Sequence, residues 1–156
     1  MKLFLFATNH NIQLGSRPSE LPDEPKRFRA EIILIVESYA ISLLAEELNT
    51  EGLSTVLEKQ DRSILEEIAG DIRIPHMYCE PTRAQRKSTG LDGEALCAWR
   101  ESQWLDKLTA SNKSPILFVF GADHLSSFSK LASRDNAIKA LVLHCDWGSS
   151  MNSEVI

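Results

Sequence analysis

Three features that would point directly to a function are missing from this sequence: a long hydrophobic run, an excess of basic residues and a familiar nucleotide or nucleophile motif. No stretch approaches the roughly 20 apolar residues that a helix needs to cross a bilayer. The 17 Lys and Arg residues against 22 Asp and Glu give a net charge of −5, which argues against a surface that follows nucleic-acid phosphates. The sequence therefore predicts neither a membrane nor a nucleic-acid partner.

Three well-known site motifs are absent: G-x-G-x-x-G, the Walker A loop and the G-x-S-x-G elbow. These motifs place backbone N–H groups around phosphates or expose a nucleophilic serine. Their absence weakens dinucleotide-binding, NTPase and serine-hydrolase interpretations. We therefore expect no nucleotide cofactor.

The three cysteines, Cys79, Cys97 and Cys145, are odd in number and lack the C-x-x-C spacing of metal sites. We expect them to be reduced and mostly buried, as free thiols are in cytosolic proteins. The apolar segment at 3–7 is too short for the core of a signal peptide. The chain is therefore expected to be cytoplasmic.

The 156 residues, 43% hydrophobic and 25% charged, have the length and composition of one globular domain. A chain of this size buries a substantial core without disulfides or metals. We expect a single α/β domain over residues 1–147 and a flexible tail at 148–156.

Short apolar runs alternate with segments of helical character along the chain. Strands are expected at 3–7, 41–45, 75–79, 115–120 and 138–144, and helices at 24–38, 54–70, 93–110 and 122–134. Such alternation requires right-handed crossover connections, which bring the strands together in parallel. The predicted fold is a mainly parallel five-stranded sheet with helices on both faces, a Rossmann-like three-layer sandwich.

Residues 32–36 are ambiguous, because their β-branched side chains also suit a strand that would end at Glu37. We favour a helix over 24–38, since charged residues precede the apolar run at helical spacing. Two segments, 11–23 and 80–92, are expected to be long loops after strand ends. They would lie at the edge where open α/β sheets bind ligands.

Two histidines each follow a predicted strand closely: His10 after 3–7, and His124 after 115–120. We expect Asp123 to cap the next helix, so that His124 lies near the positive helix end, which favours its neutral, metal-binding form. Both side chains would lie at the same edge of the sheet. The alternative is that each is a polar residue in a strand-to-helix turn.

Carboxylates follow two other predicted strands: Glu46 after the second and Glu80 after the third. Two histidines and a carboxylate suit Zn, Mn, Fe or Co with positions left for water. His10, His124 and Glu46 are therefore candidate ligands of a divalent transition metal, which would lower the pKa of bound water. Without a metal, the same groups could act as general acid and base. The alternative roles are a helix-start acid for Glu46 and a turn residue for Glu80.

Other ionisable residues fall at positions expected to be buried. Arg100 and Glu101 lie on the apolar face of the helix expected at 93–110, and such residues are rarely buried without a partner. They could pair with each other, or Arg100 could reach a substrate anion and stabilise negative charge in a transition state. His76 and His144 are expected to be core residues satisfied by backbone groups.

Several of these positions resemble motifs of the TraB/Tiki group, which is related to the ChaN-like and erythromycin-esterase-like proteins. The segment 118–125, Phe-Val-Phe-Gly-Ala-Asp-His-Leu, resembles the group's second G-x-x-H motif, and 7–10, Ala-Thr-Asn-His, resembles the first with alanine in place of glycine. Glu46 resembles the glutamate after the group's second strand, and 99–101, Trp-Arg-Glu, resembles its arginine-bearing helix. The resemblance implies a metal-assisted hydrolase, with peptidase activity in some relatives. Because the chain lacks the group's inserted helices, the substrate stays open.

Three functions are compatible with these residues. The first is a small metal-assisted hydrolase with Glu46, Glu80 and Arg100 as catalytic residues and a small-molecule or peptide substrate. The second is a non-catalytic sensor that binds an anionic metabolite or nucleotide through Arg83, Arg86 and Arg100. The third is a subunit of a larger assembly such as a homo-oligomer, suggested by the short chain and its three tryptophans.

Overall fold

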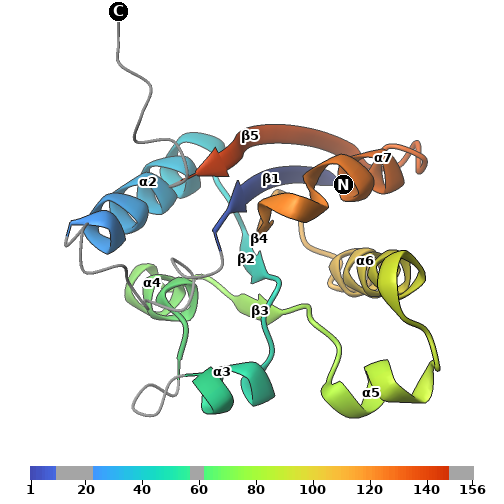
Figure 1. Ribbon diagram of the computed structural model, residues 1–156. Helices are drawn as coiled ribbons and strands as arrows, with labels where there is room; N and C mark the ends of the chain where they lie inside the picture. The colour runs from blue at the N-terminus through green and yellow to red at the C-terminus, as the bar shows by residue number, and fades with distance from the viewer. Residues whose placement is uncertain (10–22, 57–61, 148–156) are drawn as a thin grey trace, which may run out of the picture.

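The computed structural model describes residues 1–9, 23–56 and 62–147 (Figure 1). Five parallel strands form one sheet in the order β3–β2–β4–β1–β5. The strands are β1 (Lys2–Thr8), β2 (Leu43–Glu46), β3 (His76–Tyr78), β4 (Ile116–Gly121) and β5 (Lys139–Trp147). The helices are α2 (Glu24–Tyr39), α3 (Thr50–Val56), α4 (Ile64–Ile72), α5 (Arg83–Ser88), α6 (Gly93–Ala110) and α7 (Leu125–Ala132), and a 3-10 turn, η1 (Ala122–His124), precedes α7.

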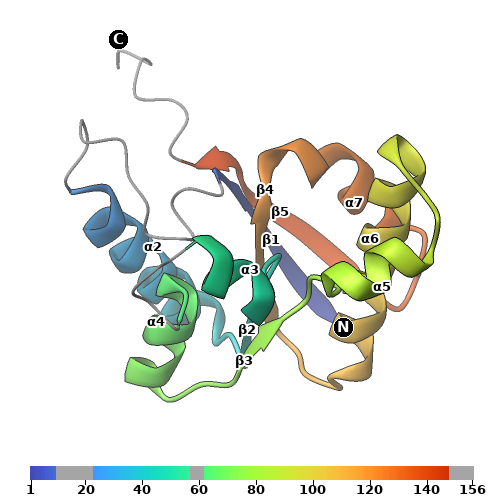
Figure 2. The same ribbon diagram turned by 60° about the horizontal axis from the view of Figure 1, so that its bottom comes forward.

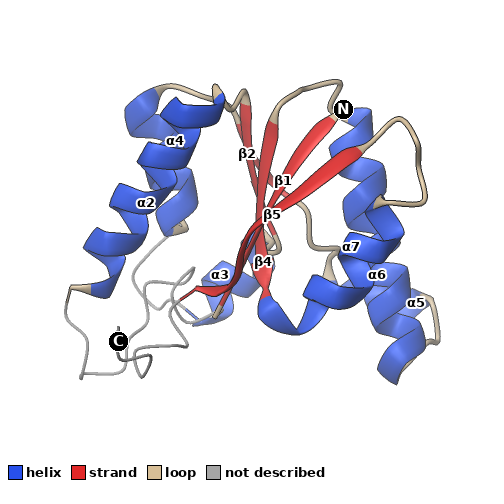
Figure 3. Cartoon of the chain, turned by 90° about the horizontal axis from the view of Figure 1, so that it is seen from above, coloured by secondary structure: helices blue, strands red, loops and turns tan. Residues whose placement is uncertain are grey.

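The sheet lies between two helical layers, as Figure 3 shows from above. Helices α2 and α4 cover one face, and α6 and α7 cover the other. Figure 1 and Figure 2 show that α3 and α5 lie outside these layers, on the side of the edge strand β3. The expected three-layer α/β fold is therefore confirmed, and the sheet is wholly parallel.

The central strand β4 is buried along its whole length. Phe118 and Phe120 pack with Trp104 and other side chains of the α6/α7 layer, whereas Leu117 and Val119 pack in the α2/α4 layer. A strand covered on both faces requires apolar residues at every position. This is why the run at 116–120 is continuously apolar and does not alternate with polar residues.

The ambiguous segment at 32–36 is helical, as the favoured interpretation predicted. Phe28, Ile32, Ile35 and Val36 are buried, and their spacing places them on one face of α2, which packs against the sheet. Leu34, on another face of the helix, is 57% exposed. The β-branched residues therefore serve helix–sheet packing, which outweighs their slight preference for strands.

Two expected segments differ from the structure. The segment 80–92 is not a continuous loop, because Thr82 and Gln85 form a capping box that starts α5. The single helix expected over 54–70 is replaced by α3 and α4, and the side chain of Ser63 accepts the Glu66 N–H at the start of α4. Most of the loop expected at 11–23 and the tail at 148–156 lie outside the described residues.

All three cysteines are free thiols. Cys79 is buried and Cys97 is half-buried, but Cys145 on the edge strand β5 is exposed, so the expectation of mostly buried thiols is wrong for Cys145. Within the described part of the chain, no helix has both the length and the apolar character required to cross a membrane.

Candidate functional site

At the carboxyl end of β4, the connections that follow neighbouring strands leave towards opposite faces of the sheet. From β4 the chain turns towards α7 on one face, whereas β1 is followed by α2, and β2 by α3 and then α4, and both α2 and α4 lie on the other face. Connections that leave in opposite directions open a crevice between strand ends, and open α/β sheets bind ligands there. His124 lies directly after β4, at this point.

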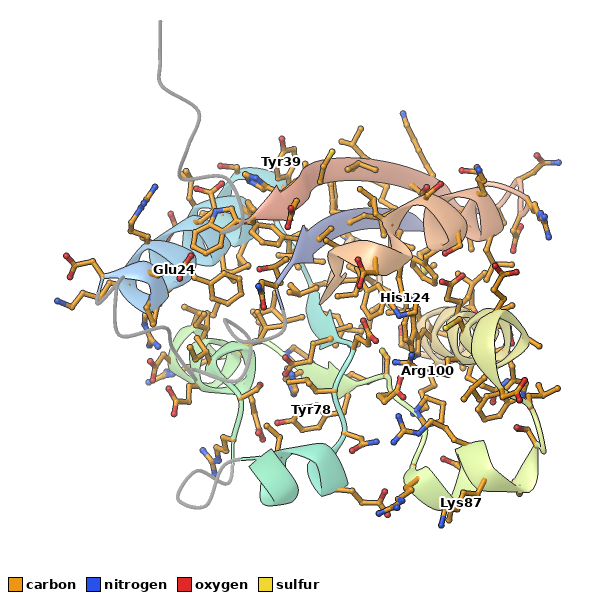
Figure 4. All side chains as sticks on the ribbon, in the orientation of Figure 1. Glu24, Tyr39, Tyr78, Lys87, Arg100 and His124 are labelled. Atoms are coloured by element: carbon orange, nitrogen blue, oxygen red, sulfur yellow. The ribbon has the colours of Figure 1, made fainter. Side chains whose placement is uncertain are left out.

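Five ionisable side chains gather at this edge on the α6/α7 face: Glu47, Glu80, Arg100, Glu101 and His124. We refer to them as the α6-side cluster. All three carboxylates are buried, and the side chains of His124 and Arg100 are 12% and 17% exposed. Figure 4 shows Arg100 and His124 close together between α6 and the start of α7. The cluster therefore combines charged groups with near-complete exclusion from water, which strengthens the interactions among them.

His124 is held in one orientation by its neighbours. Nδ1 lies 2.8 Å from Oε1 of Glu101, and Nε2 lies 3.5 Å from Oε1 of Glu47. Because the Glu101 carboxylate accepts hydrogen bonds, it favours the tautomer with the proton on Nδ1 and a lone pair on Nε2. Ser127 donates to the same Glu101 oxygen at 2.6 Å. The rings of Trp104 and His124 pack in a T-shaped arrangement with their centroids 4.9 Å apart.

Arg100 joins two carboxylates of the cluster. Its Nε and Nη2 donate to the two oxygens of Glu80 at 2.9 and 3.1 Å, and Nη2 also donates to Oε1 of Glu47 at 2.6 Å. Burial alone would lower the pKa of Arg100, but its hydrogen bonds and the negative charges of Glu80 and Glu47 raise the pKa instead. Arg100 therefore stays charged, and its partners are these two carboxylates and not the adjacent Glu101.

Glu80 is fully occupied by hydrogen bonds. Besides Arg100, it accepts from Nη1 of Arg86 at 2.8 Å and from Nε1 of Trp104 at 2.9 Å. Both carboxylate oxygens are thus used inside the protein. Each oxygen accepts two hydrogen bonds, so Glu80 fixes the guanidinium of Arg100 and has no lone pair left for a substrate, which fits a positioning role better than a catalytic one.

Glu46 lies on the other side of the sheet. Side chains alternate along a strand, and Glu46 points to the α4 face, where its hydrogen-bond partners are Ser63 at the start of α4 and His76 on β3. Both partners use Oε1, and Oε2 is buried without a hydrogen bond to any residue that the structure describes. Burial raises the pKa of Glu46, while the hydrogen bonds from His76 and Ser63 oppose this change. Glu47, the next residue, is the carboxylate that lies beside His124 and Arg100.

The remaining histidines differ from the expectation of backbone partners. Nε2 of His76 lies 2.7 Å from Glu46, and Nε2 of His144 lies 3.0 Å from Oε1 of Glu31. Both histidines are paired with carboxylates, so that expectation is wrong. The expected cap is also wrong, because Asp123 makes no capping hydrogen bond and His124 itself occupies the N-cap position of α7.

The structure thus brings together three of the residues selected from the sequence: His124, Arg100 and Glu80. It separates Glu46 from them, and His10 lies outside the described residues. No site role was predicted for Glu47 from the sequence. A signal was present, because two successive carboxylates at a strand end must point to opposite faces of the sheet.

The positions of His124 and Glu47 can be compared with those of two ligands in a metal site. Nε2 of His124 and Oε1 of Glu47 are 3.5 Å apart, close to the roughly 3.4 Å between two ligands of one tetrahedral zinc ion. The Glu101 contact to Nδ1 is the arrangement typical of metal-binding histidines. Among residues 1–9, 23–56 and 62–147, no three His, Cys, Asp or Glu side chains are placed to hold a metal ion. The described residues therefore fit a metal as a pair of ligands, and a third would have to come from elsewhere.

Comparisons with protein-family models, curated proteins and solved structures find no significant match to this chain. Its function must therefore be inferred from its own residues and their geometry.

Proposed function

We propose that this chain is a small metal-assisted hydrolase whose site is the α6-side cluster. The orientation of His124 supports this most strongly: Glu101 accepts from Nδ1, and Nε2 faces the Glu47 carboxylate. A histidine held through one ring nitrogen is arranged to use the other as a metal ligand or general base. The position beside the carboxyl end of β4 gives this nitrogen the place where α/β folds bind substrates.

Each residue has a role in this proposal. Glu101 fixes the tautomer of His124, and Ser127 satisfies the same carboxylate oxygen. His124 and Glu47 would hold a divalent transition metal such as Zn, Mn, Fe or Co, with His10 as the third ligand predicted from the sequence. When bound, such a metal lowers the pKa of a coordinated water and makes it a nucleophile at neutral pH.

Arg100 would stabilise the negative charge that develops on the substrate. Its Nε and Nη2 are used by Glu80 and Glu47, but Nη1 makes no hydrogen bond to any described residue. A guanidinium fixed by two carboxylates, with N–H donors to spare, is pre-organised to meet a developing oxyanion. The substrate proposed for this hydrolase is a small molecule or a peptide.

The ion pairs of the cluster favour a hydrolase over an anion sensor built on Arg83, Arg86 and Arg100. Arg86 and Arg100 both bind Glu80, and Arg100 also binds Glu47, so two carboxylates balance the two cations and leave no net positive charge for an anionic ligand, although Nη1 of Arg100 keeps its N–H donors. Of these three arginines, only Arg83, on the surface helix α5, is exposed and has no ion pair to a described residue.

Metal analysis combined with a hydrolysis assay tests the proposal. Purified protein would be incubated with each of the four metals, desalted and measured by mass spectrometry, then assayed with chromogenic esters, amides and phosphoesters. We expect stoichiometric metal and hydrolysis in the wild type and in His144→Ala, and neither in His124→Ala or Glu47→Gln. His144 is a matched control, because it is also paired with a carboxylate, Glu31.

Two results would contradict the proposal. One is a wild-type protein that retains none of the four metals and hydrolyses none of the substrates. The other is a His124→Ala variant that keeps both its metal and its activity. Circular dichroism of every variant would confirm that the fold is intact.

A further inference from the structure

A groove between α6 and α7 adjoins the α6-side cluster. Its volume is about 520 Å³, and its walls include Glu101 from α6, Asp123 from η1, Ser127 and Lys130 from α7, and Arg134 from the turn that follows α7. The groove is distinct from the interior of the cluster, because Arg100, Glu47 and Glu80 do not line it.

Two cations on the groove wall have no ion-pair partner. Lys130 and Arg134 are four residues apart, so they lie about one turn from each other. Both are exposed, and neither makes an ion pair with any residue in the described part of the chain. Arg86 and Arg100, at the neighbouring cluster, are by contrast bound by Glu80. The groove lining carries two acids as well as these two cations, so only its Lys130–Arg134 end presents positive charge without an ion-pair partner.

The acidic side chains of the groove lie towards its other end. Asp123 lies in η1, before α7 begins, whereas Arg134 lies in the turn after α7 ends, so the helix separates them. The Glu101 carboxylate is already occupied by His124 and Ser127. An anion would consequently be attracted to the Lys130–Arg134 end, and Leu131 offers apolar contact between the ends.

Glu101 connects the groove to the cluster. The carboxylate that forms part of the groove wall is the one bonded to Nδ1 of His124 at 2.8 Å. Ser127 likewise lines the groove and donates to Glu101. A molecule in this groove would therefore lie next to the residues that orient His124.

We propose that the groove binds the anionic group of a small molecule, a phosphate or a carboxylate, through Lys130 and Arg134. The guanidinium of Arg134 suits both groups, since its planar N–H donors match their paired oxygens. That this molecule is the substrate rests on the proposed function, and its reacting group would then have to extend past Glu101 to reach Nε2 of His124, which lies outside the groove lining. The anion site itself does not depend on hydrolysis.

Calorimetric titration with inorganic phosphate and with succinate tests the site, and ethylammonium serves as a cationic control. The wild type is expected to bind at least one of the two anions saturably and not to bind ethylammonium. The double variant Lys130→Gln/Arg134→Gln should bind that anion roughly tenfold more weakly or worse, because it loses two charge-assisted hydrogen bonds. Lys113→Gln/Lys139→Gln removes two exposed lysines elsewhere and should bind like the wild type.

The outcomes distinguish anion binding in the groove from the proposed hydrolysis at the α6-side cluster. Binding of phosphate alone or succinate alone identifies the preferred group, and binding of both supports the shared chemistry. The inference is overturned if neither anion binds saturably, or if the double variant binds as well as the wild type. Anion binding by a protein that holds no metal and hydrolyses nothing would refute the proposed function alone, whereas metal-dependent hydrolysis without anion binding would refute this site alone.

Discussion

Nδ1 of His124 lies 2.8 Å from Oε1 of Glu101, although the two residues are 23 positions apart and belong to different elements. Glu101 is buried on α6, and His124 is fixed at the start of α7 with its ring against Trp104. Packing of these two helices on the sheet therefore sets the orientation of the imidazole. The same contact determines which ring nitrogen faces Glu47.

Replacing Glu101 should weaken metal binding without unfolding the chain. In Glu101→Gln the amide can donate to Nδ1 and so favour the wrong tautomer, and losses of about 10–100-fold in metal affinity are usual for such partners. Competition with a chromogenic chelator measures this affinity. Glu31→Gln, which alters the more exposed pair with His144, should bind metal like the wild type. Equal affinity in Glu101→Gln would contradict the role assigned to Glu101.

Replacing Trp104 should cost stability as well as site geometry. The side chain is fully buried, and its Nε1 donates to Glu80 at 2.9 Å. Trp104→Phe removes buried volume and leaves a buried carboxylate with one donor fewer, so we expect a loss of about 2–3 kcal/mol in the free energy of unfolding. Urea denaturation measures it, with Trp99→Phe, at a half-buried position of the same helix, as the control. Similar values for both variants would refute the expectation.

Glu46 should make stability depend on pH. Burial raises the pKa of Glu46 above its ordinary value of 4.5, so the folded chain holds this proton more tightly than the unfolded chain does. The stabilisation from the bound proton is complete below pH 4.5 and is lost as the pH rises through the raised pKa. Glu46→Gln cannot titrate. Its free energy of unfolding should therefore increase relative to the wild type as the pH rises across this window.

Urea denaturation of both proteins between about pH 4 and pH 8 measures this difference. Glu67→Gln, at an exposed position on the neighbouring helix α4, should show no comparable trend. A constant difference between wild type and Glu46→Gln at every pH would show that Glu46 titrates alike in the folded and unfolded chain.

The three thiols should react with alkylating reagents in a fixed order. Burial raises the pKa of Cys79 to about 12, which leaves almost no reactive thiolate at neutral pH. Cys145 is exposed and Cys97 is half-buried, so Cys145 should react first and Cys79 only after unfolding. Peptide mapping after timed treatment with iodoacetamide measures the order. Rapid labelling of Cys79 in the folded protein would contradict its burial.

Local patterns in the sequence were sufficient to predict the layers of this fold. The continuous apolar run at 116–120 predicts a strand buried on both faces, and β4 is that strand. The run at 32–36 is assigned to a helix because charged residues precede it at helical spacing, and α2 is that helix. The helix α5 was missed, because its capping box at Thr82 and Gln85 is a local hydrogen-bond pattern within a segment without apolar residues at helical spacing.

The sequence by itself determined that ionisable residues follow the strands, and so placed His124 and the Glu46–Glu47 pair at one edge of the sheet. Only the tertiary structure decided which of the two glutamates joins His124. That choice depends on the strand order β3–β2–β4–β1–β5 and on the faces that α4 and α6 cover, and both are set by packing between distant segments. Adjacent side chains on a strand point to opposite faces. Glu47 therefore contacts Arg100 and His124 on one face of the sheet, and Glu46 contacts His76 on the other.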